Sequence, residues 1–439
     1  MSENNSVIDS GVDTDLIYKM ELINDINKGF PENTNTNADN PENPDFDEDN
    51  LVLTDLPSEI LIHIASYLES RTIGRSLYSA CKKFYELFSS DRYWRTRISK
   101  RWTKQYPVFE REDFNWHKAC MEREEVHKLW SNPDKHFNHF ILKEGFFAAV
   151  DVVHLMKEGK FLAVGSRDRH FNIVDLTKYD CAKEGQEKDL IVASETKAHK
   201  GWVWSMASYD DTLVTGSWDT FIRLWDFNNG AVTKSSEIKL KTAILGLYYE
   251  PNFIAACGFD KRLYMLDPRS PDDCIKKHYH SQPVLSVVAD DKYVITGSED
   301  KSVAIYDRVA GKKYKTFKTE SFVPSMSYQN NQLWMGDKAG KLNVMDTTDG
   351  LFDESLIKTF DIGNERRLTG LVPTDGGIFT SSDSIIKIVE PSSDPAIINS
   401  LNVHSGEIAR ISHNNGVLAS AGSDISVGVW IPKSCAYLS

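Results

Sequence analysis

The chain has 439 residues, of which 41% are hydrophobic and 26% are charged, and its formal net charge is −13. The length predicts two folded units with additional segments. The sequence has no apolar run of about 18 residues, so a transmembrane helix is not expected, and its first residues lack the basic start and apolar run of a secretory signal. The six cysteines form no CxxC pair, which favours reduced thiols over a disulfide framework or a zinc site.

The negative charge is concentrated at the N-terminus. Residues 1–50 contain 13 acidic and 2 basic side chains, which gives −11 and leaves −2 for the rest of the chain. We predict that residues 1–50 are a disordered acidic tail, because they bury too little apolar area to offset the entropy cost of ordering. No basic patch stands out in the remainder, so nucleic acid is not an expected partner.

Residues 51–97 are predicted to form a small domain of three helices. Thr54 or Asp55 is in position to cap the first helix, and apolar residues recur at helical intervals through LTDLPSEILIHIASYLESRTIGRSLYSACKKFYEL. The stripes of the first and second helices are Ile60, Leu61, Ile64, Leu68 and then Ile73, Leu77, Cys81, Phe84, and the third helix begins near Asp91 and contains Trp94. A domain this small cannot cover all its apolar surface. We therefore expect a second protein to cover the remainder.

Residues 98–135 have a charged, helical pattern and are predicted to be a rigid connector. From residue 136 to 439 the pattern becomes strand-like and repeats, as in LVTGSWDTFIRLWD and VITGSEDKSVAIYD. The turn between the second and third strands of each unit is marked by one anchor residue, and these anchors, 39 to 51 residues apart, are Asp168, Asp219, Asp260, Asp300, Ala339, Asp383 and Asp424. Seven such units of four strands predict a closed β-propeller.

Closure of the ring requires one strand taken from the other end of the repeat region. The last unit ends almost at the C-terminus, while the apolar run His139-Phe140-Ile141-Leu142 precedes the first complete unit. We expect residues 137–144 to supply the outer strand of the seventh blade.

One recurring set of polar residues resembles a catalytic triad in composition. His199, Ser217, Asp219 and Trp225 occur in one unit, and His280, Ser298, Asp300 and Tyr306 repeat the pattern in another. Because an enzyme has no need of several copies of its triad, we interpret the set as a structural hydrogen-bond chain. No catalytic residue, metal ligand or cofactor site is expected.

Two motifs carry a resemblance to a known family. LTDLPSEILIHIASYL followed by SLYSACKKFYEL and RYW resembles the F-box, and the repeats resemble WD repeats, so residues 53–432 are similar to F-box/WD-repeat proteins. The resemblance implies a mainly β fold, with a seven-bladed WD-repeat β-propeller preceded by a three-helix F-box and a helical linker. It also implies a non-catalytic substrate receptor of SCF-type cullin–RING ubiquitin ligases. The reduced thiols predict a location in the cytoplasm, the nucleus or both.

The resemblance also indicates which residues bind partners. Those implied to face or support the Skp adaptor are Leu56, Pro57, Ile60, Leu61, Ile64, Leu68, Leu77, Cys81 and Trp94. WD-repeat proteins bind partners near the start of each first strand and just before each anchor, which here gives Trp202, Trp204, Trp218, Phe259, Arg167, Phe322, Lys338 and Arg367. A target protein with an unknown degron is the expected ligand.

Three alternatives stay open. The tryptophans could instead fill contacts between blades. A target segment could place an apolar residue on the tryptophans and an acidic or phosphorylated one near Arg167 or Arg367, although Glu299 and Glu407 lie among these positions. The chain could also be a scaffold that joins the adaptor without directing degradation. A propeller enzyme is disfavoured, because the selected positions are mainly aromatic or of mixed charge.

Overall fold

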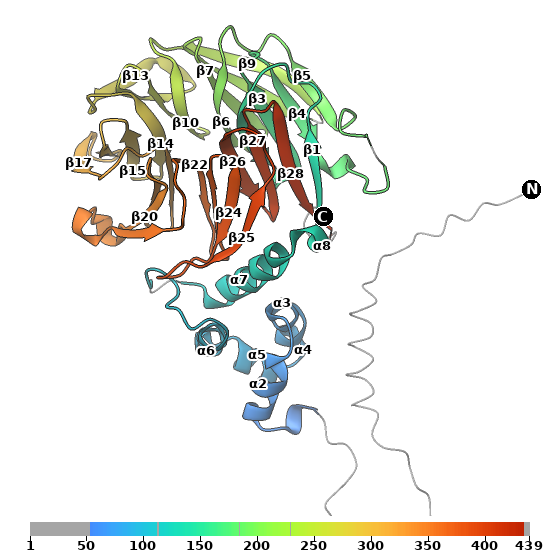
Figure 1. Cartoon of the computed structure of the whole chain (residues 1–439). Helices are drawn as coiled ribbons and strands as arrows, with labels where there is room; N and C mark the ends of the chain where they lie inside the picture. The colour runs from blue at the N-terminus through green and yellow to red at the C-terminus, as the bar shows by residue number, and fades with distance from the viewer. Residues whose placement is uncertain (1–52, 112–113, 184, 229, 434–439) are drawn as a thin grey trace, which may run out of the picture. The chain divides into compact units, whose positions relative to one another are not determined.

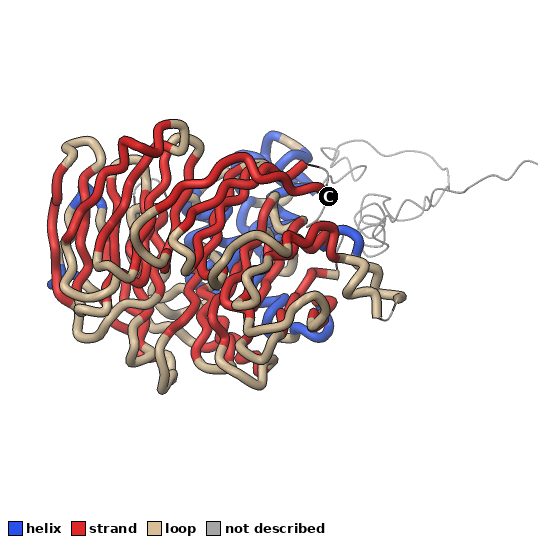
Figure 2. Tube along the Cα trace, turned by 90° about the horizontal axis from the view of Figure 1, so that it is seen from above, coloured by secondary structure: helices blue, strands red, loops and turns tan. Residues whose placement is uncertain are grey.

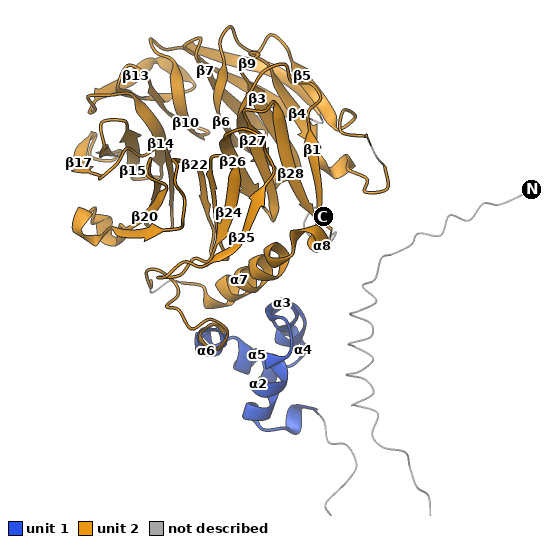
Figure 3. Cartoon of the chain, viewed as in Figure 1, with its two compact units in different colours: residues 1–97 blue, residues 98–439 orange. Residues whose placement is uncertain are grey.

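The computed structural model describes residues 53–111, 114–183, 185–228 and 230–433, so the predicted acidic tail over residues 1–50 lies outside the described residues. The chain divides into two compact units, residues 1–97 and residues 98–439 (Figure 3). The described part of the first unit is helical, and the second is built mainly of strands. Among the described helices, we find none with the length and apolar character that crossing a bilayer requires.

The helical unit begins with the short turn η1 (Leu53–Asp55), followed by helix α2 (Ser58–Ser66). Pro57 occupies the N-cap position and no side chain caps the helix, so the prediction of a cap at Thr54 or Asp55 was wrong. The next helical segments are α3 (Ser70–Thr72), η2 (Ile73–Leu77), α4 (Tyr78–Ala80), α5 (Lys82–Phe88) and α6 (Asp91–Arg101). The backbone of Cys81 is extended, with φ −157° and ψ 164°. The predicted second helix is therefore divided in two at this residue.

Seven antiparallel sheets of four strands form the propeller, and each sheet is one blade (Figure 1). Blades 1 to 3 comprise β2–β5 (Val150–Met156, Phe161–Ser166, Phe171–Asp175, Ile191–Glu195), β6–β9 (Val203–Tyr209, Thr212–Ser217, Phe221–Asn228, Ala231–Lys239) and β10–β13 (Ile244–Glu250, Phe253–Gly258, Arg262–Asp267, Ser270–His278). Blades 4 to 6 comprise β14–β17 (Val284–Ala289, Tyr293–Ser298, Ser302–Asp307, Lys312–Lys318), β18–β21 (Ser325–Gln329, Gln332–Gly336, Lys341–Asp346, Lys358–Asp361) and β22–β25 (Leu368–Pro373, Ile378–Ser382, Ile385–Val389, Ile397–Asn402). Short helical turns follow strands of blades 1 and 5, namely η3 (Leu176–Lys178), η4 (Thr348–Gly350) and η5 (Glu354–Leu356).

Blade 7 closes the ring with a strand from the start of the unit. Its sheet order is β1-β28-β27-β26, from β1 (Phe137–Leu142), β26 (Ile408–Asn414), β27 (Val417–Gly422) and β28 (Ser426–Pro432). β1 pairs antiparallel with β28 from Phe137 opposite Pro432 to Leu142 opposite Val427. The predicted outer strand at residues 137–144 is confirmed. Closure leaves only short sheet edges at the outside of each blade.

The first strand of every blade contacts the first strands of its neighbours, so these seven strands line the centre of the ring. Loops join the strands at both ends of the sheets (Figure 2). Successive side chains of a strand point to opposite faces, and apolar side chains from neighbouring blades meet between the sheets. One such cluster joins Ala163 and Ile173 of blade 1 to Val203, Leu213 and Trp225 of blade 2. The core therefore consists of interfaces between blades, as repeat architectures require.

Blade 6 departs from the predicted repeat at its anchor turn. In other blades the residue after the anchor has positive φ, as at Thr220 (φ 74°) and Lys301 (φ 60°), whereas in blade 6 Asp383 itself has positive φ (54°). Ser382 pairs directly with Ile385 across this turn. The turn is thus shorter than in blade 2, and Asp383 does not occupy the position of Asp219. The assignment of Asp383 as an anchor was wrong.

The connector belongs to the same compact unit as the propeller. Helix α7 (Trp116–Ser131) begins at Asn115, whose side chain accepts a hydrogen bond from the Lys118 amide at 2.9 Å, and α8 (Pro133–His136) leads into β1. The ring of Trp130 lies 4.2 Å from that of Phe137 and 5.5 Å from that of Phe379, centroid to centroid. These contacts attach α7 to blades 6 and 7.

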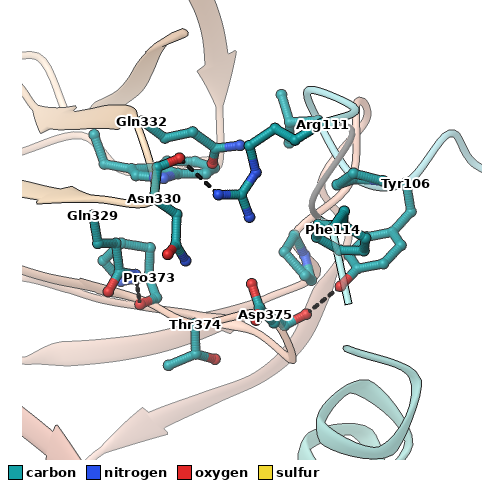
Figure 4. A pocket seen from close by; sticks show the side chains of 13 residues that line it. Tyr106, Arg111, Phe114, Gln329, Asn330, Gln332, Pro373, Thr374 and Asp375 are labelled. Atoms are coloured by element: carbon teal, nitrogen blue, oxygen red, sulfur yellow. Dashed lines mark hydrogen bonds between the residues drawn. The ribbon is translucent and has the colours of Figure 1, made fainter. Parts of the chain in front are cut away.

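The segment before α7 packs against the ends of strands in blades 5 and 6 (Figure 4). Tyr106 donates a hydrogen bond through Oη to the Asp375 carbonyl at 2.7 Å, and Arg111 donates one through Nη1 to the Asn330 carbonyl at 2.9 Å. The cavity enclosed there measures about 30 Å³. A volume of this size has room for an ordered water but not for an organic ligand, so we interpret the contact as structural.

Candidate functional site

The first candidate surface is an apolar stripe on α2. Pro57, Ile60, Ile64 and Tyr67 follow one another at helical spacing, and we call these four residues the α2 stripe. The exposed fractions of Ile60, Ile64 and Tyr67 are 45%, 40% and 78%. Large apolar side chains exposed side by side mark an interaction surface. The α2 stripe therefore fits the expectation that a second protein covers this unit.

The remaining predicted adaptor residues differ in exposure. Leu61 and Trp94 are buried, and Trp94 donates a hydrogen bond through Nε1 to the Phe88 carbonyl at 2.7 Å. These two side chains support the surface from within. The partly buried members of the set are Leu56, Leu68, Leu77 and Cys81.

Two basic residues that the sequence reading missed hold the stripe in place. Lys83 donates through Nζ to the carbonyls of Thr54 and Leu56, at 2.6 and 2.9 Å, and so anchors the segment before α2. Arg97 donates to the carbonyls of Ala65 and Leu68 at 3.0 and 2.6 Å. Cations near a helix C-terminus satisfy its free carbonyls and interact favourably with its dipole.

The second candidate surface is an aromatic cluster on the propeller, formed by Trp202, Trp204, Trp218 and Phe259. The ring of Trp218 lies at the centre, with centroid distances of 5.3 Å to Trp202, 5.8 Å to Trp204 and 6.2 Å to Phe259. Trp202, Trp218 and Phe259 have exposed fractions of 39%, 37% and 57%. The structure thus brings together four side chains from two blades, and it leaves three of them open to solvent.

Arg167 completes this cluster from blade 1. Its guanidinium carbon lies 4.9 Å from the Trp202 ring centroid and 6.0 Å from that of Trp204, within the range of cation–π contacts. The same guanidinium donates to both carboxylate oxygens of Asp151, with its Nε at 3.1 and 3.0 Å. Burial raises the pKa of Asp151, and the hydrogen bonds from Arg167 oppose that rise. Arg167 is therefore a neutralised partner of the cluster rather than a free cation.

The other predicted rim residues lie on different blades. Lys338 of blade 5 has its Nζ 5.2 Å from the Phe322 ring centroid. Arg367 of blade 6 forms a bidentate ion pair with Glu407 of blade 7, at 2.8 and 3.0 Å. Among the described residues, no ring contact joins these three side chains to the aromatic cluster. Both arginines expected to face an acidic group, Arg167 and Arg367, are already paired.

The His–Asp sets form hydrogen-bond chains inside single blades. In blade 2, His199 Nδ1 lies 3.0 Å from Asp219 Oδ2, and its Nε2 lies 2.8 Å from the hydroxyl of Thr215, which also accepts a hydrogen bond from Trp225 Nε1 at 2.9 Å. Thr215, which the predicted set did not include, is thus the hydroxyl that joins His199 to Trp225, whereas Ser217 accepts a hydrogen bond from the Asp219 amide at 3.1 Å. Thr296 lies at the same position beside His280 in blade 4.

The electrostatics of the blade 2 chain agree with a structural role. Burial lowers the pKa of His199, against the opposing effect of Asp219. Burial alone would raise the pKa of Asp219, but hydrogen bonds from His199 and from backbone amides hold it well below its ordinary value. Within the described ranges, His, Cys, Asp and Glu side chains form no group of three or more that could hold a metal ion.

Comparison with known proteins finds matches for both folded units. Residues 53–100 match the family described as F-box-like, residues 270–435 match the WD40 repeated domain, and residues 192–226 match the WD domain, G-beta repeat. The chain is 34% identical to F-box/WD repeat-containing protein 9 of Bos taurus over 380 residues, which cover 86% of this chain and 82% of that protein. It is 33% identical to the Homo sapiens protein of the same name, with the same coverage.

The name of a more distant relative also contains both terms, F-box and WD repeat. The chain is 24% identical to F-box/WD repeat-containing protein mec-15 of Caenorhabditis elegans, over 72% of this chain and 79% of that protein. An F-box-like segment followed by WD repeats is the organisation of an F-box substrate-adaptor type protein. With these matches and its seven-bladed propeller, the chain belongs to the F-box/WD-repeat protein family.

Proposed function

We propose that this chain is the substrate receptor of an SCF-type ubiquitin ligase. The helical unit binds the Skp adaptor through the α2 stripe, and the propeller binds the protein to be ubiquitinated through the aromatic cluster. The observation that carries the proposal is that each unit has its own uncovered apolar surface: Ile60, Ile64 and Tyr67 on one, and Trp202, Trp218 and Phe259 on the other. One surface serves the ligase and the other serves the target.

In this proposal the chain accelerates ubiquitin transfer without a reacting group of its own. It holds a target lysine near the ubiquitin-loaded enzyme, which raises the effective concentration of the two reactants. Trp and Arg dominate binding energy when they are desolvated at an interface. The cluster of four aromatic rings, two of which contact Arg167, supplies such a surface.

The proposal is tested by capturing the full-length protein from cells and quantifying its partners by mass spectrometry. The double variant Leu56→Ala/Pro57→Ala is expected to lose the Skp adaptor and keep the target proteins. The variant Trp202→Ala/Trp218→Ala is expected to keep the adaptor and lose the targets. If both variants retain both classes of partner, the two surfaces are misassigned.

The alternative is a scaffold that joins the adaptor without directing degradation. We test it by replacing the protein in cells with the Leu56→Ala/Pro57→Ala variant and measuring the abundance of the captured targets. A receptor predicts that the targets accumulate, because they stay bound but are no longer ubiquitinated. Unchanged abundance of every captured target would support the scaffold.

A further inference from the structure

A cavity of about 130 Å³ lies at the centre of the propeller, between the first strands of blades 3 to 7. Its lining is apolar or hydroxyl-bearing with one exception, Arg410 of β26. Blade 7 adjoins blade 1, so β26 lies next to β2, and β2 in turn lies next to β6 of the aromatic cluster. We call this space the channel cavity.

The register of the strands shows how unusual Arg410 is. In six of the seven first strands a bulge follows the first paired residue, and pairing resumes at Val152, Ser205, Gly246, Ser286, Gly370 and Arg410. Five of these are small or aliphatic, as the crowded centre of a propeller requires. Blade 7 alone places a long cation at this position. Arg410 lies near the start of β26, and Trp204 lies near the start of the corresponding strand of blade 2, β6.

Arg410 has no partner among the described residues. Its guanidinium forms no ion pair or hydrogen bond with them, in contrast to Arg167 and Arg367. Asp151 interacts with Arg410 over a longer distance, but both its oxygens already accept from Arg167. Burial raises the pKa of the nearby Cys257 thiol to about 12, so this group contributes no negative charge. Arg410 is only partly buried, so its guanidinium is open to a counter-ion that enters the channel cavity.

The side-chain hydroxyls that line the cavity already donate their protons to backbone carbonyls. Ser286 donates its hydroxyl proton to the Val323 carbonyl at 3.2 Å, Ser325 to the Leu368 carbonyl at 2.8 Å, and Thr369 to the Ile408 carbonyl at 2.6 Å. The hydroxyls of the cavity can therefore only accept hydrogen bonds from a ligand, and the guanidinium of Arg410 supplies the side-chain donors. A single guanidinium matches a single carboxylate, which accepts two parallel hydrogen bonds. A phosphate dianion requires more donors and more positive charge than the wall supplies.

We propose that Arg410 binds the carboxylate of an Asp or Glu side chain in the target protein, while a neighbouring apolar residue of the same segment packs against the aromatic cluster. This inference rests on the proposed function, because it specifies what the target surface recognises. Asp151 joins the two parts: it pairs with Arg167, which stacks on Trp202, and it interacts with Arg410. The target class is a segment that contains an acidic residue beside an apolar one.

The test selects binders from a displayed library of short random peptides on the full-length protein in complex with the Skp adaptor. Peptides enriched by the wild type are resynthesised with Asp or Glu replaced by Asn or Gln, and Kd is measured for each form. We expect the enriched peptides to share one acidic residue, whose neutralisation weakens binding roughly tenfold or more. Arg410→Gln should cause a similar loss, and the two changes combined should cost little more than either alone.

Three controls show whether a change in Kd is caused by loss of the Arg410 guanidinium. Arg410→Lys retains the charge and should bind more tightly than Arg410→Gln. Arg366→Gln removes an arginine whose side chain is 71% exposed and paired with Asp383, and it should leave Kd unchanged. The melting temperature of each variant shows whether the propeller is folded. If a variant is unfolded, Arg410→Glu is measured instead with a peptide whose acidic residue is replaced by Lys, which tests the same contact with the charges exchanged.

The outcomes separate the two proposals. If the wild type enriches no peptide, recognition of a linear target segment fails, and this inference fails with it. If peptides are enriched but share no acidic residue, or bind Arg410→Gln with unchanged Kd, the carboxylate site is wrong while the proposed function stands. A phosphoserine peptide that binds far more tightly than its Asp counterpart would overturn the argument from a single donor group.

Discussion

At the scale of single residues, the hydroxyl of Thr215 connects two strands of blade 2 to the loop that contains His199. It accepts a hydrogen bond from Trp225 Nε1 at 2.9 Å and lies 2.8 Å from His199 Nε2, and all three side chains are buried. Buried polar groups left without partners cost about 1–3 kcal/mol each. Loss of this one hydroxyl would leave two such groups without a partner, so it contributes strongly to the stability of the blade.

The variant Thr215→Val keeps the shape of the side chain and removes the hydroxyl. We expect it to lower the free energy of unfolding by roughly 2–4 kcal/mol, because the Trp225 N–H and the His199 ring nitrogen both lose their partner. Ser217→Ala removes one hydrogen bond, from the Asp219 amide, and should cost about 1 kcal/mol. Melting temperatures measured side by side provide the ranking. Equal losses in both variants would contradict the assignment of Thr215 as the hydroxyl that joins His199 to Trp225.

His413 predicts how stability depends on pH. Its ring stacks on Phe379 at 4.1 Å, its Nε2 is buried without a hydrogen bond to the described residues, and burial lowers its pKa to about 4. The folded-state pKa lies below the ordinary value of 6.5, so the proton binds the unfolded chain more readily. Stability is therefore complete above pH of about 6.5 and falls as the pH drops towards 4.

His413→Phe keeps the stacked ring and removes the titrating group. The variant should gain roughly 2 kcal/mol relative to the wild type between pH 7 and pH 5, and the gap between their melting temperatures should widen over that range. His278→Asn, at an exposed position of the outer strand β13, is the matched control for replacing a histidine. A gap that does not change for His413→Phe would exclude this histidine as a source of acid sensitivity.

At the scale of elements, the connector is held to the propeller by a buried arginine of α7. Arg123 is 1% exposed, and its guanidinium carbon lies 4.3 Å from the Trp102 ring centroid and 4.5 Å from that of Tyr106. Its Nη2 lies 3.5 Å from Glu390 in blade 6. Burial lowers the pKa of Arg123, and Glu390 opposes this effect.

Arg123→Met tests how firmly α7 is attached. Removing one partner of a buried ion pair typically costs 3–5 kcal/mol, so we expect a loss of roughly 3 kcal/mol and faster proteolytic cleavage between residues 102 and 136. Lys104→Met removes an exposed ion pair with Asp394, whose side chain is 76% exposed, and should cost less than about 1 kcal/mol. Equal protease resistance of wild type and Arg123→Met would show that the connector is held by its apolar contacts alone.

At the scale of the whole molecule, the repeat made the fold predictable. A period near 40 residues indicates a propeller, and the apolar run before the first unit indicates how the ring closes. Trp202, Trp218 and Phe259 could be placed together because the start of each first strand and the position before each anchor recur at the same place in each blade. The shortened turn at Asp383 was missed, because the repeat spacing does not reveal a deletion inside a turn.

Charge pairing was harder to predict. Arg167 and Arg367 are neutralised by Asp151 and Glu407, and the second of these pairs crosses between blades. Whether two charges meet depends on side-chain geometry that spacing along one blade does not encode. Arg410 was missed for a related reason: it lies inside a first strand, where its place at the channel cavity follows from the bulge in the pairing.

The central claim is that the helical unit leaves an apolar surface for another protein. The most direct measurement is a calorimetric titration of the purified full-length chain with the Skp adaptor. We predict saturable one-to-one binding, a loss of roughly 100-fold or more in affinity for Leu56→Ala/Pro57→Ala, and unchanged affinity for Trp202→Ala/Trp218→Ala. Absence of binding by the wild type, or equal binding by the wild type and the Leu56→Ala/Pro57→Ala variant, would contradict the account.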